Sequence, residues 1–199
     1  TIVIFACTLL LVLTKPKGLH EAWAACLGAA AFLVLGFVSP GEALEVTHAG
    51  RSILFFLVTL LTLGAFVHES GFFAWAAMHA AARAGGRADR LFRNVFVLGA
   101  LVTAFLSLDA TAVLLTPLVA EFCKRLKLSP APYVVLCAFV ANAGSLLFPV
   151  SNLTNLLLLQ RYPMSSLAFA ARMLVPQFVV LCAVYIGLRT LYRTELRAS

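Results

Sequence analysis

The sequence predicts an all-α, polytopic membrane protein that contains a re-entrant helical hairpin and a broken transmembrane helix. The first observation is composition: the 199 residues are 62% hydrophobic and 12% charged, with a mean hydropathy of +1.00. Soluble domains are roughly 45–50% apolar and about 25% charged, and a globule of this length could not bury so much apolar surface. The other two observations are basic residues confined to short runs between apolar segments, and two long apolar stretches with polar interruptions.

Residues 1–67 are predicted to form three transmembrane helices. The apolar segments are Thr1–Leu13, which ends at a Lys-Pro-Lys-Gly turn, Ala22–Val38, which Ser-Pro-Gly stops, and Ile53–Val67. A spanning helix needs about 20 apolar residues, so segments of this kind are candidates to cross the bilayer. Between the last two, Glu42–Arg51 is predicted to be a polar loop.

Residues 68–93 differ from the preceding segments. Apolar positions such as Phe72, Phe73 and Trp75 come first, and four arginines between positions 83 and 93 follow. This pattern is typical of an amphipathic helix that lies in the membrane interface. We predict such a helix on the cytoplasmic side, broken at Gly85-Gly86.

Residues 94–123 form an apolar stretch that a polar segment, Ser107–Thr111, interrupts. If the stretch returns to the side from which it enters, twelve Lys and Arg residues lie on one side of the membrane and three on the other; a single crossing gives eight and seven. The positive-inside rule favours the first arrangement. Each arm is then about thirteen residues, too short to span, so we predict a re-entrant hairpin with its tip near mid-membrane. Irregular backbone at that depth is tolerated only inside protein or beside a watery cavity.

Residues 131–160 are predicted to be a broken transmembrane helix. Polar residues, a glycine and a proline interrupt it between Asn142 and Asn155, and Pro149 has no amide hydrogen to donate. The helix resumes beyond the break. Residues 167–188 are predicted to be a final transmembrane helix, and 189–199 a basic tail.

The tip of the hairpin carries the first candidate binding residues. Asp109 is the carboxylate that lies deep in an apolar segment, and ionisable groups inside a membrane generally mark an ion or substrate pathway. Because hydrocarbon disfavours its charged form, Asp109 is suited to carry a proton. The alternative is that it merely caps the second arm. Ser107 and Thr111 offer hydroxyls to a cation or a neutral polyhydroxy solute, unless they bond to their own backbone.

The broken helix carries the second group of candidates. Two kinds of side chain, amides and hydroxyls, gather within fourteen residues of otherwise apolar sequence: Asn142, Ser145, Ser151, Asn152, Thr154 and Asn155. Together with the carbonyls that a break releases, they could coordinate an ion. The alternative is hydrogen bonding between helices, worth roughly 0.6–2 kcal/mol per contact.

Several functional classes have no support in the sequence. The apolar segments contain no histidine for a serine–histidine pair, and no glycine-rich phosphate loop is present, so we predict that the chain is not an enzyme. The five cysteines lack CxxC spacing and the histidines lack metal-ligand spacing, so we predict neither a metal site nor a cofactor. The pI near 9.5 reflects orientation in the lipid bilayer rather than binding to nucleic acid.

Three ordered motifs resemble the ion transporter superfamily, and most closely its bacterial arsenite permease branch. They are His-Glu-Ser-Gly-Phe-Phe-Ala-Trp-Ala at 68–76, Ser-Leu-Asp-Ala-Thr-Ala-Val-Leu-Leu-Thr-Pro at 107–117, and Asn-Ala-Gly-Ser-Leu-Leu-Phe-Pro-Val-Ser-Asn-Leu-Thr-Asn at 142–155. The resemblance covers essentially the whole chain. It implies a multi-pass protein of the plasma (inner) membrane with two inverted repeats, each with a re-entrant hairpin and a broken helix, that works as an elevator-type exchanger and is often a dimer.

The resemblance also assigns the candidate residues. Ser107, Asp109 and Thr111 match the hairpin tip, and the six polar residues between 142 and 155 match the broken helix. In the sodium–carboxylate branch a Ser-Asn-Thr triplet binds sodium, but here Leu153 interrupts it. In the arsenite branch, arsenic or antimony hydroxide leaves in exchange for protons. The resemblance therefore implies a small inorganic solute as substrate and favours a proton over sodium as the coupling ion.

Length is the main departure from the family, whose members are about twice as long. The sequence has one hairpin and one broken helix and resembles one transporter repeat, the N-terminal half. It would be a fragment, a subunit paired with a second half, or one of two copies in opposite orientations; the charge bias disfavours the last. We therefore expect half of a proton-coupled arsenite or antimonite efflux transporter. A sodium-coupled carboxylate or other anion transporter and a non-transporting membrane scaffold subunit are the alternatives.

Overall fold

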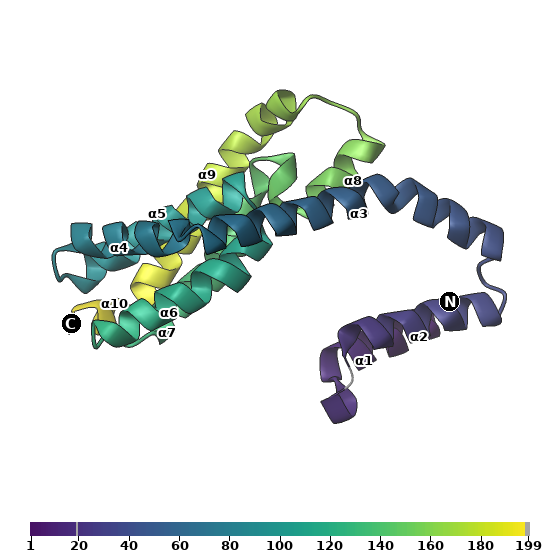
Figure 1. Ribbon diagram of the computed structural model, residues 1–199, viewed down its shortest axis with the longest axis horizontal. Helices are drawn as coiled ribbons and strands as arrows, with labels where there is room; N and C mark the ends of the chain where they lie inside the picture. The colour runs from purple at the N-terminus through teal and green to yellow at the C-terminus, as the bar shows by residue number, and fades with distance from the viewer. Residues whose placement is uncertain (19, 198–199) are drawn as a thin grey trace. The chain divides into compact units, whose positions relative to one another are not determined.

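The computed structural model describes residues 1–18 and 20–197, and this part of the chain is helical, with no strand. Figure 1 shows its helices along the sequence. The predicted all-α class is confirmed. The chain divides into two compact units, Thr1–Leu54 and a second unit that begins at Phe55.

The first unit contains α1 (Ile2–Thr14), a short 3-10 turn (Pro16–Gly18), α2 (Glu21–Val34) and the beginning of α3 (Pro40–Glu69). Helices α1 and α2 pack closely because Gly28 has no side chain; a Cβ atom there would overlap Thr8. The two helices have 13 and 14 residues, fewer than the ~20 that a straight span needs. Three transmembrane helices within residues 1–67 therefore stay a prediction.

Helix α3 corrects one expectation. The segment predicted to be a polar loop, Glu42–Arg51, belongs to this 30-residue helix. A capping box starts the helix: the amide of Ser39 donates to Glu42 Oε2 (2.8 Å) and the amide of Glu42 donates to Ser39 Oγ (3.2 Å). Two reciprocal bonds satisfy amides that a helix N-terminus leaves free, so the polar residues continue as helix. Its part Gly50–Glu69 is long and apolar enough to cross a membrane.

The second unit contains the rest of α3 and seven further α-helices among the described residues. They are α4 (Phe72–Ala84), α5 (Ala88–Phe105), α6 (Thr116–Arg125), α7 (Ala131–Ala143), α8 (Leu153–Arg161), α9 (Ser166–Leu191) and α10 (Arg193–Arg197). Helix α5 packs against α4 and α7. Its buried Phe92 and Val95 belong to a core shared with Leu115, Leu136 and Val140.

Residues 68–93 were expected to form an amphipathic helix broken at Gly85-Gly86, and the structure has a break at that place: residues 68–69 end α3, 72–84 form α4 and 88–93 begin α5. Gly85 and Gly86 adopt positive φ angles, 60° and 76°, which glycine accepts without strain, and they separate α4 from α5. Helix α4 buries Phe73 and Ala77 and packs along α5. Its position in a membrane interface stays a prediction.

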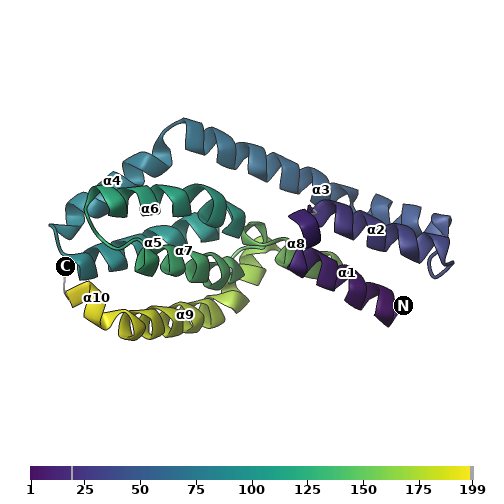
Figure 2. The same ribbon diagram turned by 90° about the horizontal axis from the view of Figure 1, so that it is seen from below.

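Helices α5 and α6 form a hairpin that returns to the end from which it starts (Figures 1 and 2). The hydroxyl of Tyr133, shortly after the end of α6, donates to the carbonyl of Ala88 at the start of α5 (3.1 Å). The first arm has 18 residues; the second comprises a six-residue π-helical segment, Ala110–Leu115, followed by the ten residues of α6. Both arms are longer than the thirteen residues expected: the first because helix begins directly after Arg87, and the second because α6 continues to Arg125.

Helix α9 is the second candidate membrane span by length and composition, with 26 residues. The Oγ of Ser165 caps it by accepting from the amide of Ala168 (3.2 Å). It packs against α7, as Figure 2 shows. Because it is a continuous helix of 26 residues, it provides a scale for the depth of the other elements.

Candidate functional site

At the hairpin tip, Ser107 rather than Asp109 caps the second arm. The buried Oγ of Ser107 accepts from the amide of Ala110 (3.1 Å). Asp109 is half-buried, and among the described residues its carboxylate has no hydrogen bond or ion pair. The alternative that Asp109 acts as the N-cap is therefore wrong. The carboxylate remains available for other chemistry.

Thr111 joins the two arms. Its hydroxyl and that of Thr103 lie 2.8 Å apart, and both side chains are fully buried. The Thr111 carbonyl accepts from the Thr116 hydroxyl (2.9 Å). Thr103 was not among the predicted residues, because a single threonine in an apolar helix gives no signal of a partner on another arm.

The helix break lies between α7 and α8 and contains two short 3-10 turns, Gly144–Leu146 and Pro149–Ser151. Asn155 is buried and donates its side-chain amide to the carbonyls of Ser145 (2.8 Å) and Phe148 (3.0 Å). These carbonyls lose their helical partners at the break. The side chain of Asn155 therefore compensates for part of the interruption.

Ser145 and Asn152 form a second contact across the break. Asn152 Nδ2 donates to Ser145 Oγ (3.3 Å), and Ser145 Oγ donates to the carbonyl of Asn142 (2.7 Å). Asn152 Oδ1 also caps α8 by accepting from the amide of Thr154 (3.0 Å). The two side chains thus fix the start of α8 against the end of α7.

Gln177 of α9 forms hydrogen bonds to the same break from a neighbouring helix, and it too was not predicted from the sequence. Its Oε1 accepts from the amide of Leu146 (2.9 Å), and its Nε2 donates to the carbonyl of Ala143 (2.8 Å). The side chain is 5% exposed. A glutamine near the middle of the predicted span 167–188 was the available signal.

The hairpin tip and the helix break lie against each other. Ser151 Oγ donates to the carbonyl of Ala104, at the end of the first arm (2.7 Å). A Cβ at Gly144 would lie 3.1 Å from the Cβ of Thr103, so the backbone of the break packs directly on α5. The rings of Phe105 and Phe148 are 5.5 Å apart.

Of the nine predicted binding residues, six are joined by hydrogen bonds at the tip and the break: Ser107, Thr111, Ser145, Ser151, Asn152 and Asn155. Asp109 follows the tip on the second arm. Asn142 is exposed and donates to Ala138 of its own helix (3.0 Å), and the exposed Thr154 contributes its backbone amide. We call the six residues, with Thr103, Asp109 and Gln177, the junction.

The junction lies about halfway along α9. At 1.5 Å per residue, Gln177 is about 16 Å from the start of α9 at Ser166 and about 21 Å from its end at Leu191. The clefts of about 690, 350 and 340 Å³ are lined by other residues. Within the described residues, no group of three or more His, Cys, Asp or Glu side chains could hold a metal ion.

The chemistry of the junction is that of neutral hydroxyls, amides and carbonyls beside one carboxylate. Most of its side-chain donors already bond to the backbone, which leaves oxygen lone pairs and the Asp109 carboxylate to meet a ligand. Such a set suits a small polar solute, a monovalent cation or a proton. It offers no cationic side chain to an anion.

Comparisons with known proteins agree on a transporter family. Residues 8–199 match the family described as CitMHS, citrate transporter. The chain is 32% identical to the arsenical pump membrane protein of Escherichia coli K12 over 196 residues, which are 97% of this chain and 46% of that protein. The values for the protein of the same name in Shigella flexneri are identical, and the Yersinia enterocolitica protein is 31% identical over 202 residues, 98% of this chain and 46% of that protein. The chain spans about half the length of these curated relatives, and no solved structure matches it significantly.

Proposed function

Because the chain belongs to the CitMHS citrate transporter family of the ion transporter superfamily, and is therefore part of an integral membrane protein, we propose that it forms the N-terminal half of a secondary active transporter. We propose further that this transporter moves arsenite or antimonite out of the cell in exchange for protons. The relatives named arsenical pump membrane proteins support this substrate class. The junction is its solute site, and Asp109 is its proton carrier.

One observation carries the proposal. The half-buried carboxylate of Asp109, which has no hydrogen bond or ion pair among the described residues, follows a hairpin tip whose backbone accepts a hydrogen bond from the helix break. Trivalent arsenic in water is a neutral hydroxide, whose O–H groups match hydroxyl, amide and carbonyl acceptors. A neutral solute gives no electrical driving force of its own, so its export needs a coupled ion. A carboxylate midway through the fold can bind and release a proton and so supplies that coupling.

We expect Asp109→Asn to abolish arsenite resistance, because the amide has nearly the same shape but cannot bind and release a proton. The measurement is growth of an arsenite-sensitive bacterium that carries the transporter, together with arsenite uptake into inside-out vesicles with an imposed proton gradient. Glu121→Gln is the matched control, because Glu121 is an exposed carboxylate on α6 that pairs with Arg125 (3.1 Å). Resistance at the wild-type level in Asp109→Asn, with both proteins inserted equally, would disprove the role of Asp109.

The name of the matching family favours a second candidate, a sodium-coupled transporter of citrate or another carboxylate. The junction argues against it in two ways. Leu153 separates the Ser-Asn pair from Thr154, and Asn152 Oδ1 is occupied by the amide of Thr154. Transport assayed with a sodium gradient and with a proton gradient, for arsenite and for citrate, separates the two candidates.

A non-transporting membrane scaffold is the candidate from another class, and the hydrogen bonds within the junction favour it in part. If the junction only packs helices, alanine at Ser107, Asp109 and Asn152 together changes the stability of the oligomer and leaves solute flux unchanged. If the junction is a solute site, flux is lost in the same variant. Gel filtration and vesicle flux on one preparation distinguish these results.

A further inference from the structure

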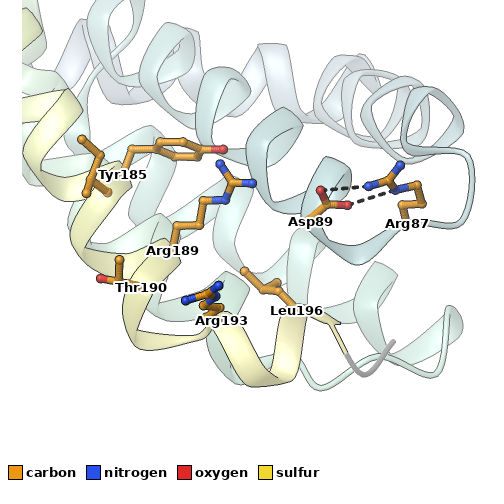
Figure 3. Close-up of a pocket in the computed structure, with 8 residues that line it drawn as sticks. Arg87, Asp89, Tyr185, Arg189, Thr190, Arg193 and Leu196 are labelled. Atoms are coloured by element: carbon orange, nitrogen blue, oxygen red, sulfur yellow. Dashed lines mark hydrogen bonds and ion pairs between the residues drawn. The ribbon is translucent and has the colours of Figure 1, made fainter.

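A basic cleft of about 690 Å³ opens where α5 begins and α9 ends, away from the junction. Arg87 and Asp89 line it from the start of α5, and Tyr185, Arg189, Thr190 and Arg193 line it from α9 and α10 (Figure 3). Its volume lies within the roughly 300–1,000 Å³ of small-molecule sites. The proposed transport function makes no use of it.

The charge of this cleft favours an anion. Three arginines face one aspartate, which leaves a net charge of +2. Partial burial opposes ionisation of Asp89, but its hydrogen bond with Arg87 and the charges of Arg87 and Arg189 hold its pKa below the ordinary value. Among the described residues, neither Arg189 nor Arg193 forms an ion pair, and the Arg189 guanidinium lies over the ring of Tyr185 (5.9 Å). Two guanidinium groups are thus available to a phosphate.

An apolar groove of about 340 Å³ adjoins the basic cleft, because Tyr185 lines both. Phe96 and Ala100 of α5 line one wall, and Phe178 and Cys182 of α9 line the other. From Arg189 to Phe178 the α9 axis rises about 16 Å, which is close to half of the ~30 Å hydrocarbon thickness. The basic cleft and the groove together therefore extend along α9 over about the depth of one lipid leaflet.

We propose that the basic cleft and this groove together bind one anionic phospholipid. The phosphate contacts Arg189 and Arg193, and an acyl chain lies between α5 and α9. A free phosphate would use the basic cleft alone and would leave the apolar groove unexplained. A basic cleft at one end of a spanning helix, continued by an apolar groove toward its middle, matches both parts of a lipid.

Native mass spectrometry of the purified protein in detergent tests this proposal with three probes. These are phosphatidylglycerol, phosphatidylcholine with the same acyl chains, and inorganic phosphate. We expect phosphatidylglycerol to bind in preference to the other two. Arg189→Gln with Arg193→Gln should weaken its binding about 25-fold, because each arginine near an anionic surface contributes about fivefold.

The matched charge control is Lys124→Gln with Lys127→Gln, which removes two positive charges from the last turn of α6 and the turn that follows it, at the same end but outside the cleft. We expect the affinity of this variant for phosphatidylglycerol to stay within about twofold of the wild-type affinity, because direct contact rather than net charge holds the lipid. Equal weakening in both double variants would show attraction to net charge alone and would overturn the site.

A second pair of variants tests the groove. Cys182→Trp fills it without a change of charge and should weaken phosphatidylglycerol binding about tenfold, since the loss of only two buried methylenes has that effect. Val179→Trp places the same side chain on an exposed position of α9 and should have no effect. Two results together would show a free-anion site and refute the lipid proposal: displacement of the lipid by inorganic phosphate, and binding of phosphatidylglycerol to Cys182→Trp that equals binding to wild type. Equal circular dichroism spectra establish that each variant is folded.

Discussion

At the scale of single residues, the junction replaces backbone hydrogen bonds with side-chain bonds. Asn155 donates to two carbonyls released by the break, and Gln177 bonds to one amide and one carbonyl on the same segment. A buried carbonyl without a partner destabilises a fold by roughly 1–3 kcal/mol. These two amides therefore contribute to stability whatever solute the site takes. Asp109 has no such role among the described residues.

We expect Asn155→Leu to lower the thermal unfolding temperature in detergent, because two buried carbonyls lose their donor at roughly 1–3 kcal/mol each. Asn142→Leu is the matched control, since the exposed Asn142 side chain bonds only to the carbonyl of Ala138 within α7. The unfolding temperature of that variant should lie within a degree or two of the wild-type value. Equal loss of stability in the two variants would contradict this account of the break.

The sequence predicted the residue types of the junction better than their partners. Ser107 and Asp109 stood out because both are polar and lie inside an apolar stretch, yet only the structure shows that the cap is Ser107. Thr103 and Gln177 lie 8 and 31 residues from the groups they bond to. Periodicity and composition carry no information on such pairs, because the fold alone brings them together.

At the scale of elements, the close approach of α5 to the broken helix depends on glycine. A Cβ at Gly99 would lie 2.6 Å from Val140 Cγ1, and one at Gly144 would lie 3.5 Å from the backbone of Ala100. Small residues at helix contacts let backbones approach in membranes. Without them the tip and the break would separate, and the Ser151 bond to Ala104 would lengthen.

We expect Gly144→Ala to destabilise the protein by roughly 1–3 kcal/mol through overpacking, which is about 2–4 °C in unfolding temperature per kcal/mol. Gly187→Ala on α9 is the matched control, because no atom lies within 4 Å of the position that a Cβ would take there. In an exposed helix interior this change should be neutral or stabilise by about 0.5–1 kcal/mol. An unfolding temperature of Gly144→Ala equal to that of Gly187→Ala would show that the contact is not tight.

Element types followed from the sequence more closely than element boundaries. The break was visible because Gly144 and Pro149 interrupt an apolar run, and the hairpin because Ser107–Thr111 does. The start of α3 was missed because polar residues between 42 and 51 suggested a loop, whereas the capping box of Ser39 and Glu42 favours helix. The first arm proved longer than expected because α5 includes residues 88–93, which the charge pattern had assigned to an interfacial helix.

At the scale of the whole molecule, topology follows from the hairpin. The ends of α6 and α9 and the start of α5 lie together, so arginines and lysines from three elements gather at one end of the second unit. The positive-inside rule predicts that this end faces the cytoplasm. The curated relatives are about twice as long as the chain.

Labelling with a membrane-impermeant thiol reagent tests this topology. We expect Arg90→Cys and Lys124→Cys to react from the same side and Tyr162→Cys from the opposite side, because the hairpin returns and α7–α8 crosses. The background replaces Cys7, Cys26 and Cys182 with alanine, and the buried Cys123 and Cys137 serve as unreactive internal controls. Reaction of Arg90→Cys and Lys124→Cys from opposite sides would show that the segment between them crosses the membrane once and is not a re-entrant hairpin.

The hairpin tip and the helix break together have an electrostatic consequence. Helices α5 and α7 end at the junction, while the second arm and α8 begin there. Each helix end carries about half an elementary charge, negative at a C-terminus and positive at an N-terminus, so the four macrodipoles nearly cancel. Within the described junction, Asp109 is the one ionisable side chain, so no other side chain there contributes a whole charge to the local field.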